Sequence, residues 1–179
     1  MTIEDLAREV RTLKDINEIK DITSEYWYAL DTKDPERLRE VFATGEIRIS
    51  YDDMPTWRNR DHFVKSFTRF SAPEWRLENH FGLNPRIRIV DETNATGLWR
   101  HIMFGFNYDS RSVMRVTGDY HLEYVRQDDG WKISSMLFKR HSFLSASVLA
   151  DGTFNSGDFG PDTATKFKEL FGSSRPPNE

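Results

Sequence analysis

The sequence predicts an α+β domain in which helices are followed by an antiparallel sheet. Apolar residues recur every three or four positions from Ile3 to Tyr26, which is the spacing of one face of a helix. From Trp75 onward the pattern changes to long β-type segments, which are separated by turn residues at 91–94, 109–112 and 128–130. A chain of 179 residues fits one domain, which we place at residues 1–172.

Three helices are expected before the sheet, and the first of them is bent. Asp15 and Glu18 have capping-box spacing, which predicts a bend and a second helix start near Asp15. Asp34 and Pro35 predict the next start, because Asp caps free amide groups and Pro suits the first helical position. The third helix is expected over 61–70. The apolar spacing that predicts the first helical stretch consists of Ile3, Leu6, Val10, Leu13, Ile16, Ile19, Ile22 and Tyr26.

The strands are predicted from residue alternation. Residues 47–51 alternate as a short strand. In 113–127 one set is expected to face the interior: Met114, Val116, Gly118, Tyr120, Leu122 and Tyr124. In 95–108 both faces are apolar, so we expect one to line a pocket and the other to contact a second subunit. This pattern predicts a homo-oligomer.

Composition excludes several functions. A net charge of -4 argues against nucleic-acid binding and against anionic membranes. No run approaches the ~18 apolar residues of a membrane span, so a cytoplasmic protein is expected. Without cysteine there is no thiol chemistry. The 13 Phe, 5 Trp and 6 Tyr suit a pocket for a flat apolar ligand.

Acid–base chemistry is the favoured reading, since glycine-rich phosphate motifs and nucleophile elbows are absent. Asp119, His121 and Glu123 share a strand face and offer a metal site, but we favour a solvated outer face and expect no metal or other cofactor. Asp31 ends a helix and can orient a strand histidine, His80 or His101, although such a histidine is also a common structural group. Alternation places His80 on an apparently outward face with Arg76 and Glu78, so a bulge near Gly82 or Pro85 is expected to turn it inward.

Several segments resemble a known family. Residues 26–34 and 47–51 are similar to scytalone dehydratase, residues 13–16 and 79–82 to bile acid 7α-dehydratase, and residues 129–133 to a strand–turn–strand of the whole group. The chain therefore resembles the SnoaL-like branch of the nuclear transport factor 2-like superfamily. The resemblance implies a cone-shaped, curved mixed or antiparallel sheet wrapped around N-terminal helices, a cystatin-like roll. It also implies a homotrimer (or dimer).

The resemblance carries over individual residues. Asp31 and His80 match the family's Asp–His dyad, while Tyr26, Tyr51 and Arg140 match other active-site positions. Met103 stands where the bile acid enzyme has an aspartate, and the second scytalone histidine falls near Gly105, so His101 is a candidate substitute. The expected substrate-binding residues are His101, Met103, Trp99, Phe81, Tyr120 and Phe138. Residues 144–172, with a helical pattern at 162–171, are expected to form a C-terminal lid, and residues 173–179 a flexible tail.

These residues predict a cofactor-independent lyase that removes water from a β-hydroxy carbonyl substrate with a polycyclic, steroid-like or polyketide-like body. An isomerase, a cyclase or a dehydrohalogenase would use the same dyad and remains open. A non-catalytic small (β) subunit of a ring-hydroxylating dioxygenase, or a ligand-binding protein without turnover, also remains open.

Overall fold

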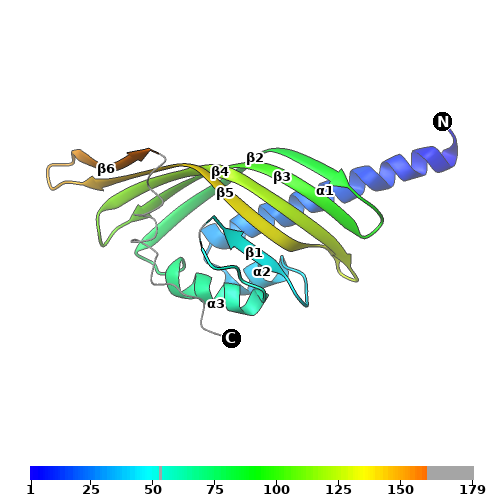
Figure 1. The fold of residues 1–179 in the computed structure, drawn as a ribbon, viewed down its shortest axis with the longest axis horizontal. Coiled ribbons are helices and arrows are strands. Elements are labelled where there is room, and N and C mark those ends of the chain that lie inside the picture. The colour runs from blue at the N-terminus through cyan, green and yellow to red at the C-terminus, as the bar shows by residue number, and fades with distance from the viewer. Residues whose placement is uncertain (53, 161–179) are drawn as a thin grey trace.

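The computed structural model describes residues 1–52 and 54–160 (Figure 1). Helices lead and long strands follow, which confirms the predicted α+β class. No helix in these described residues is long and apolar enough to cross a membrane. The elements in chain order are α1 (Ile3–Asp31), α2 (Pro35–Glu40), β1 (Arg48–Tyr51), α3 (Arg60–Phe70), β2 (Arg76–Ile89), β3 (Asn94–Asn107), β4 (Ser112–Gln127), β5 (Gly130–Val148) and β6 (Phe154–Gly160).

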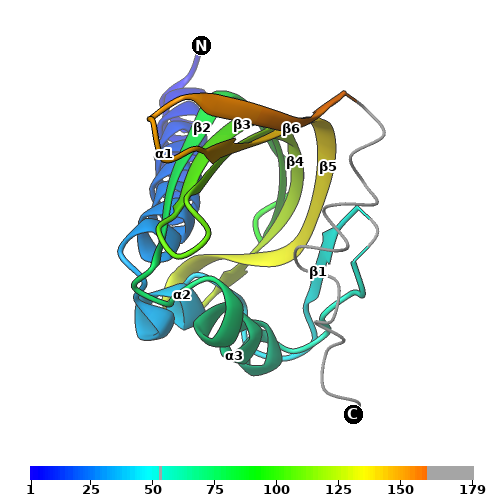
Figure 2. The same cartoon turned by 90° about the vertical axis from the view of Figure 1, so that its left-hand side faces the viewer.

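The six described strands form one curved mixed sheet that does not close. The strand order is β1-β5-β4-β3-β2, with β6 also paired to β5. All pairs are antiparallel except β1, which runs parallel to β5. Register shifts in the β4–β5 ladder add twist to the long strands, and Figure 2 shows the sheet curving around an interior with α2 and α3 along its lower side. The helix α1 contacts β2 and β5 and so lines the same interior.

Capping residues place the helix ends as predicted, with one exception. Asp34 caps α2 by accepting a hydrogen bond from the Arg37 amide, and Pro35 is the first residue of that helix. The helix start predicted at Asp15 is wrong, because α1 runs unbroken for 29 residues. Asp15 is instead buried, and its carboxylate accepts a hydrogen bond from Arg126 of β4. It ties the helix to the sheet rather than starting a new helix.

The period of two holds on β2, β3 and β4, but on β2 the polar set that was assigned to solvent faces inward. On β4 the predicted inward residues Val116 to Tyr124 are buried at every second position. On β2 the charged residues Arg76 and Glu78 are also buried, and they share the inward face with His80. A register shift does occur where the bulge was expected, between Leu83 and Arg86, but His80 faces inward without its help.

The outer face of β2 and β3 is apolar and exposed. Phe81 and Phe104 pack against each other with ring centroids 6.3 Å apart, and Leu83 and Phe106 are exposed near them. Such a band is unusual for a monomer, so contact with a second subunit through this face stays a prediction.

The predicted lid begins as sheet. Strand β5 continues to Val148 and β6 pairs back on it, so residues 144–160 include a hairpin that prolongs the sheet. The helical pattern at 162–171, the rest of the lid and the tail lie outside the described residues.

Gly118 is expected to tolerate no side chain, because a Cβ there would lie 2.4 Å from the Lys139 carbonyl oxygen. Gly105 is the matched control, since its Cβ would meet the flexible Met114 side chain at 2.7 Å. We expect Gly118→Ala to lower the free energy of unfolding by about 1–3 kcal/mol and Gly105→Ala by clearly less. Urea unfolding checks this, and equal losses would contradict it.

Candidate active site

The structure brings Asp31 and His80 together at the end of α1. The Nδ1 atom of His80 lies 2.6 Å from Oδ1 of Asp31, and the His80 amide N–H also donates to both carboxylate oxygens at 3.1 Å. The His80 side chain is only 8% exposed. Because an ionised carboxylate can only accept, the ring proton lies on Nδ1 and Nε2 carries a free lone pair. The arrangement can therefore receive a proton at Nε2.

Three tyrosine hydroxyls gather on the same concave side. The hydroxyls of Tyr26 from α1 and Tyr51 from β1 lie 2.5 Å apart, and the Tyr120 ring from β4 contacts both rings. Burial raises the pKa of all three phenols above the ordinary value. The hydroxyls therefore stay protonated near neutral pH and can donate hydrogen bonds.

His101 on β3 stands beside the dyad. Its ring centroid is 5.5 Å from that of His80, 4.9 Å from Tyr120 and 5.5 Å from Phe138. The residue is 5% exposed, and neither ring nitrogen has a hydrogen-bond partner within the described part of the chain. Burial, with a smaller effect from His80, lowers the pKa of His101 to about 3. A neutral imidazole there offers one donor and one acceptor.

The buried, neutral state of His101 predicts acid sensitivity. The unfolded chain binds the proton near pH 6.5 but the folded chain only near pH 3, so the free energy of unfolding falls as pH decreases between these values. Between pH 7 and about pH 4.5 the loss from this group is on the order of 2–3 kcal/mol. We expect His101→Gln to flatten the decline measured by urea unfolding. His121→Gln, at an exposed position, should leave the slope unchanged. Parallel slopes for the wild type and His101→Gln would contradict this assignment.

Of the predicted apolar substrate-binding residues, three are buried on the inner side of the sheet and one is exposed on the outer side. Met103 is the cross-strand partner of His80 and is buried. Phe138 is buried against Tyr120, with ring centroids 4.7 Å apart. Trp99 is buried farther along β3, where its Nε1 donates to a tyrosine hydroxyl. The prediction that Phe81 lines the pocket is corrected, because its side chain is exposed on the outer face of the sheet. Adjacent strand residues point to opposite sides, and its neighbour His80 points inward.

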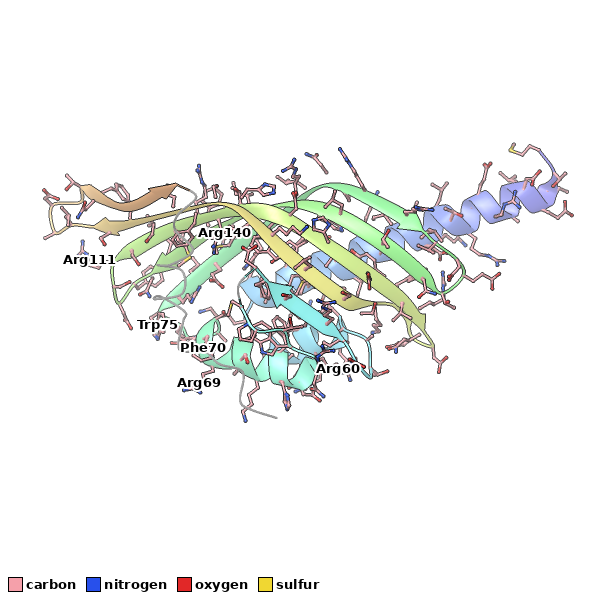
Figure 3. The ribbon with its side chains drawn as sticks, viewed as in Figure 1. Arg60, Arg69, Phe70, Trp75, Arg111 and Arg140 are labelled. Atoms are coloured by element: carbon pink, nitrogen blue, oxygen red, sulfur yellow. The ribbon has the colours of Figure 1, made fainter. Side chains whose placement is uncertain are left out.

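Arg140 lies on β5, two residues after Phe138. Its Nε is 3.9 Å from Oδ2 of Asp52, and its backbone N–H donates to the same carboxylate. Figure 3 places Arg140 close to the sheet and away from the arginines labelled on α3. Its cross-strand partner is Gly118, which in turn pairs with His101, so Arg140 lies on the same side of the sheet as His101.

The sequence did not identify one pair of site residues. Arg76 and Glu78 form a buried ion pair, with Nη2 2.5 Å and Nε 2.8 Å from Oε1, and each side chain is 9% exposed. They occupy the two inward positions before His80. The spacing of two between charged residues and a histidine was visible, but it was interpreted as an outward face.

No metal site appears in the described residues. On the outer side Asp119 forms an ion pair with Arg100 and lies 3.2 Å from Nε2 of His141, while His121 and Glu123 are exposed. Within residues 1–52 and 54–160, no group of three or more His, Asp or Glu side chains is arranged to hold an ion. The Asp119 carboxylate is therefore engaged with Arg100 and His141.

The chain shares this fold, helices followed by an open, curved mixed sheet, with an NTF2-like protein of cystatin-like fold from Novosphingobium aromaticivorans, which aligns with a TM-score of 0.63 at 17% identity over 76% of this chain and 88% of its own. Residues 11–137 match the SnoaL-like domain, and the chain belongs to this family.

Solved structures extend the likeness. A hexachlorocyclohexane dehydrochlorinase, LinA type 2, aligns with a TM-score of 0.70 at 19% identity over 86% of this chain and 98% of its own. A Novosphingobium aromaticivorans protein assigned as a scytalone dehydratase aligns with a TM-score of 0.69 at 23% identity, over 74% and 87%. Another from that organism, assigned as an aromatic ring hydroxylase, gives 0.65 at 18% identity, over 81% and 94%. At these identities the likeness shows the fold, and this chain's chemistry must be argued from its own side chains.

Proposed function

We propose that this protein is a cofactor-independent lyase that removes water from a β-hydroxy carbonyl compound with an apolar, polycyclic body. The Asp31–His80 hydrogen bond carries the proposal. A carboxylate that orients an imidazole at 2.6 Å, with the ring 8% exposed among aromatic side chains, is the arrangement of a general base.

The reaction follows from the free lone pair on His80. Nε2 takes the proton from the carbon next to the carbonyl, and the electron pair of that C–H bond moves onto the carbonyl oxygen as an enolate. The enolate then re-forms the carbonyl and a carbon–carbon double bond, while the β-hydroxyl leaves with the proton from Nε2 as water. Asp31 stabilises the imidazolium between these steps. A positioned base of this kind contributes about 100- to 10,000-fold.

Neutral donors suit the enolate. The phenols of Tyr26, Tyr51 and Tyr120 stay protonated because burial raises the pKa of each. His101 stays neutral because its pKa is lowered to about 3. Donors aimed at a developing oxyanion are each worth about 100- to 1,000-fold in enzymes that use them. We assign this role to Tyr26, Tyr51 or His101. Arg140 is a further candidate donor, and its guanidinium lies 3.9 Å from the Asp52 carboxylate.

The alternative functions differ in whether they need the first proton transfer. An isomerase, a cyclase or a dehydrohalogenase needs the same base. Because a dehydrochlorinase has a similar fold, loss of halide is included in the test below. A small subunit of a ring hydroxylase, or a binding protein without turnover, has no use for an oriented imidazole. The buried dyad therefore favours an enzyme over a scaffold.

The test is a panel of polycyclic compounds incubated with the purified chain. It includes β-hydroxy ketones, the matching β-chloro ketones and β,γ-unsaturated ketones, and all three products are conjugated enones that absorb in the ultraviolet. Turnover of hydroxy ketones alone supports dehydration. Turnover of chloro compounds alone, or of β,γ-enones alone, replaces dehydration with halide loss or isomerisation. If no compound of the panel is converted, and no α-hydrogen exchanges for deuterium in heavy water, the role of His80 as the general base is contradicted.

A further inference from the structure

The first turns of α1 extend beyond the sheet. Figure 1 shows this end of the helix running away from the strands to the N-terminus. Over residues 1–14 no side chain is buried, and the first buried residue of α1 is Asp15. The free end is well formed, because Thr2 and Asp5 close a capping box at 2.9 and 3.1 Å.

This projecting segment carries an exposed apolar stripe. Ile3, Leu6, Val10 and Leu13 are between 43% and 83% exposed. Their spacing of three, four and three residues is that of the a and d positions of a coiled coil. We call these four residues the seam.

The seam lies on a different side from the face that packs in the protein. At 3.6 residues per turn it points about 150° away from the buried residues of α1. The sequence pattern had joined both sets into one amphipathic face, and the structure separates them. The buried residues are Asp15, Ile19, Thr23, Tyr26, Trp27, Ala29 and Leu30.

We propose that the seam is a dimer contact with a second copy of this chain, formed as a parallel two-stranded coiled coil. The residue types fit that partner, since β-branched residues at a and leucine at d favour two parallel strands. Ile3 and Val10 occupy a, and Leu6 and Leu13 occupy d. The next a position is Asn17, which is exposed, and a polar residue at one a position fixes register and partner number.

Charges beside the seam select the parallel orientation. Glu9 falls at position g and Lys14 at the following e position, and these positions meet between parallel helices. Each Glu9 would then face Lys14 of the partner subunit. In an antiparallel pair like charges would meet instead, because g lies opposite g and e opposite e. The seam also lies opposite the body, so two copies can join without their sheets colliding.

The first experiment uses the absence of cysteine from the chain. Leu6→Cys places equivalent sulfurs next to each other across a parallel pair, whereas Arg8→Cys, the matched control at the outer f position, does not. Under mild oxidation we expect a disulfide-linked dimer of Leu6→Cys at low micromolar concentration, and little from Arg8→Cys. Equal cross-linking of both variants, or none with Leu6→Cys, would overturn the proposal.

The second experiment exchanges the charges. Glu9→Lys or Lys14→Glu alone should each halve the particle mass measured by analytical ultracentrifugation, and the double exchange should restore the wild-type mass. Circular dichroism verifies the helix in each of the three variants, and both changed positions are exposed. A double variant that stays at half mass, or single variants that keep the wild-type mass, would overturn the parallel pairing. Neither outcome bears on the Asp31–His80 chemistry.

Discussion

Replacing Asp31 with asparagine is expected to lower turnover by about 100- to 10,000-fold while leaving the fold intact. The carboxylate accepts a hydrogen bond from the Nδ1–H of His80 and so keeps the ring proton on Nδ1 and Nε2 unprotonated. An asparagine amide that donates to Nδ1 forces the ring proton onto Nε2, where no lone pair is left to take a substrate proton. The amide oxygen can still accept from the His80 backbone N–H, which the carboxylate binds at 3.1 Å, so the helix end stays attached to β2.

The measurement is kcat/KM for the panel compound that the wild type converts, with the melting temperature as the check on folding. His80→Ala should lose a similar factor, and the double variant should be no worse than either single one, because residues that act as a unit are not additive. His62→Ala, on the exposed side of α3, is the control and should keep full turnover. If Asp31→Asn retains wild-type kcat/KM, the dyad is not the base and the proposed reaction is wrong.

Most of the fold could be predicted because its signals are local. The capping pair Asp34–Pro35 and the alternation of β4 each follow from neighbouring residues, and the structure agrees with both. The break expected at Asp15 failed because its cap-like spacing competes with a distant partner. Arg126 lies more than a hundred residues away in sequence, and no local pattern contains it.

The candidate site was harder because its interior is partly charged. Alternation assigns polar residues to solvent, so Arg76 and Glu78 were placed outside and His80 needed a bulge to face inward. Two opposite charges that neutralise each other can instead be buried together, and all three residues then share the inner face. The same period of two explains Phe81, which follows His80 directly and so must face outward.

The second large effect is expected from this buried pair. Arg76→Met should lower the free energy of unfolding by about 3–5 kcal/mol, because it removes the guanidinium whose Nη2 and Nε both contact Oε1 of Glu78, in a site that is 9% exposed. Changing both residues, with Arg76→Met and Glu78→Leu together, should cost far less than the sum of the single changes. Urea unfolding of the four proteins gives the coupling directly.

The exposed ion pair between Arg58 and Glu46 is the matched control. Its N–O distance is 3.0 Å, but the side chains are 61% and 76% exposed, so Arg58→Met should cost less than about 1 kcal/mol. Additive costs at Arg76 and Glu78 would show that their charges are not coupled.

The pair also bears on the site chemistry, because the charge of Glu78 contributes to the raised pKa of Tyr51 and Tyr120. Without Arg76 that charge is unbalanced near an enolate, so Arg76→Met should lower kcat, whereas the double variant should recover part of it. A stable double variant with no recovery of kcat would mean that Arg76 contacts the substrate itself, which would make it a catalytic residue rather than a counter-ion.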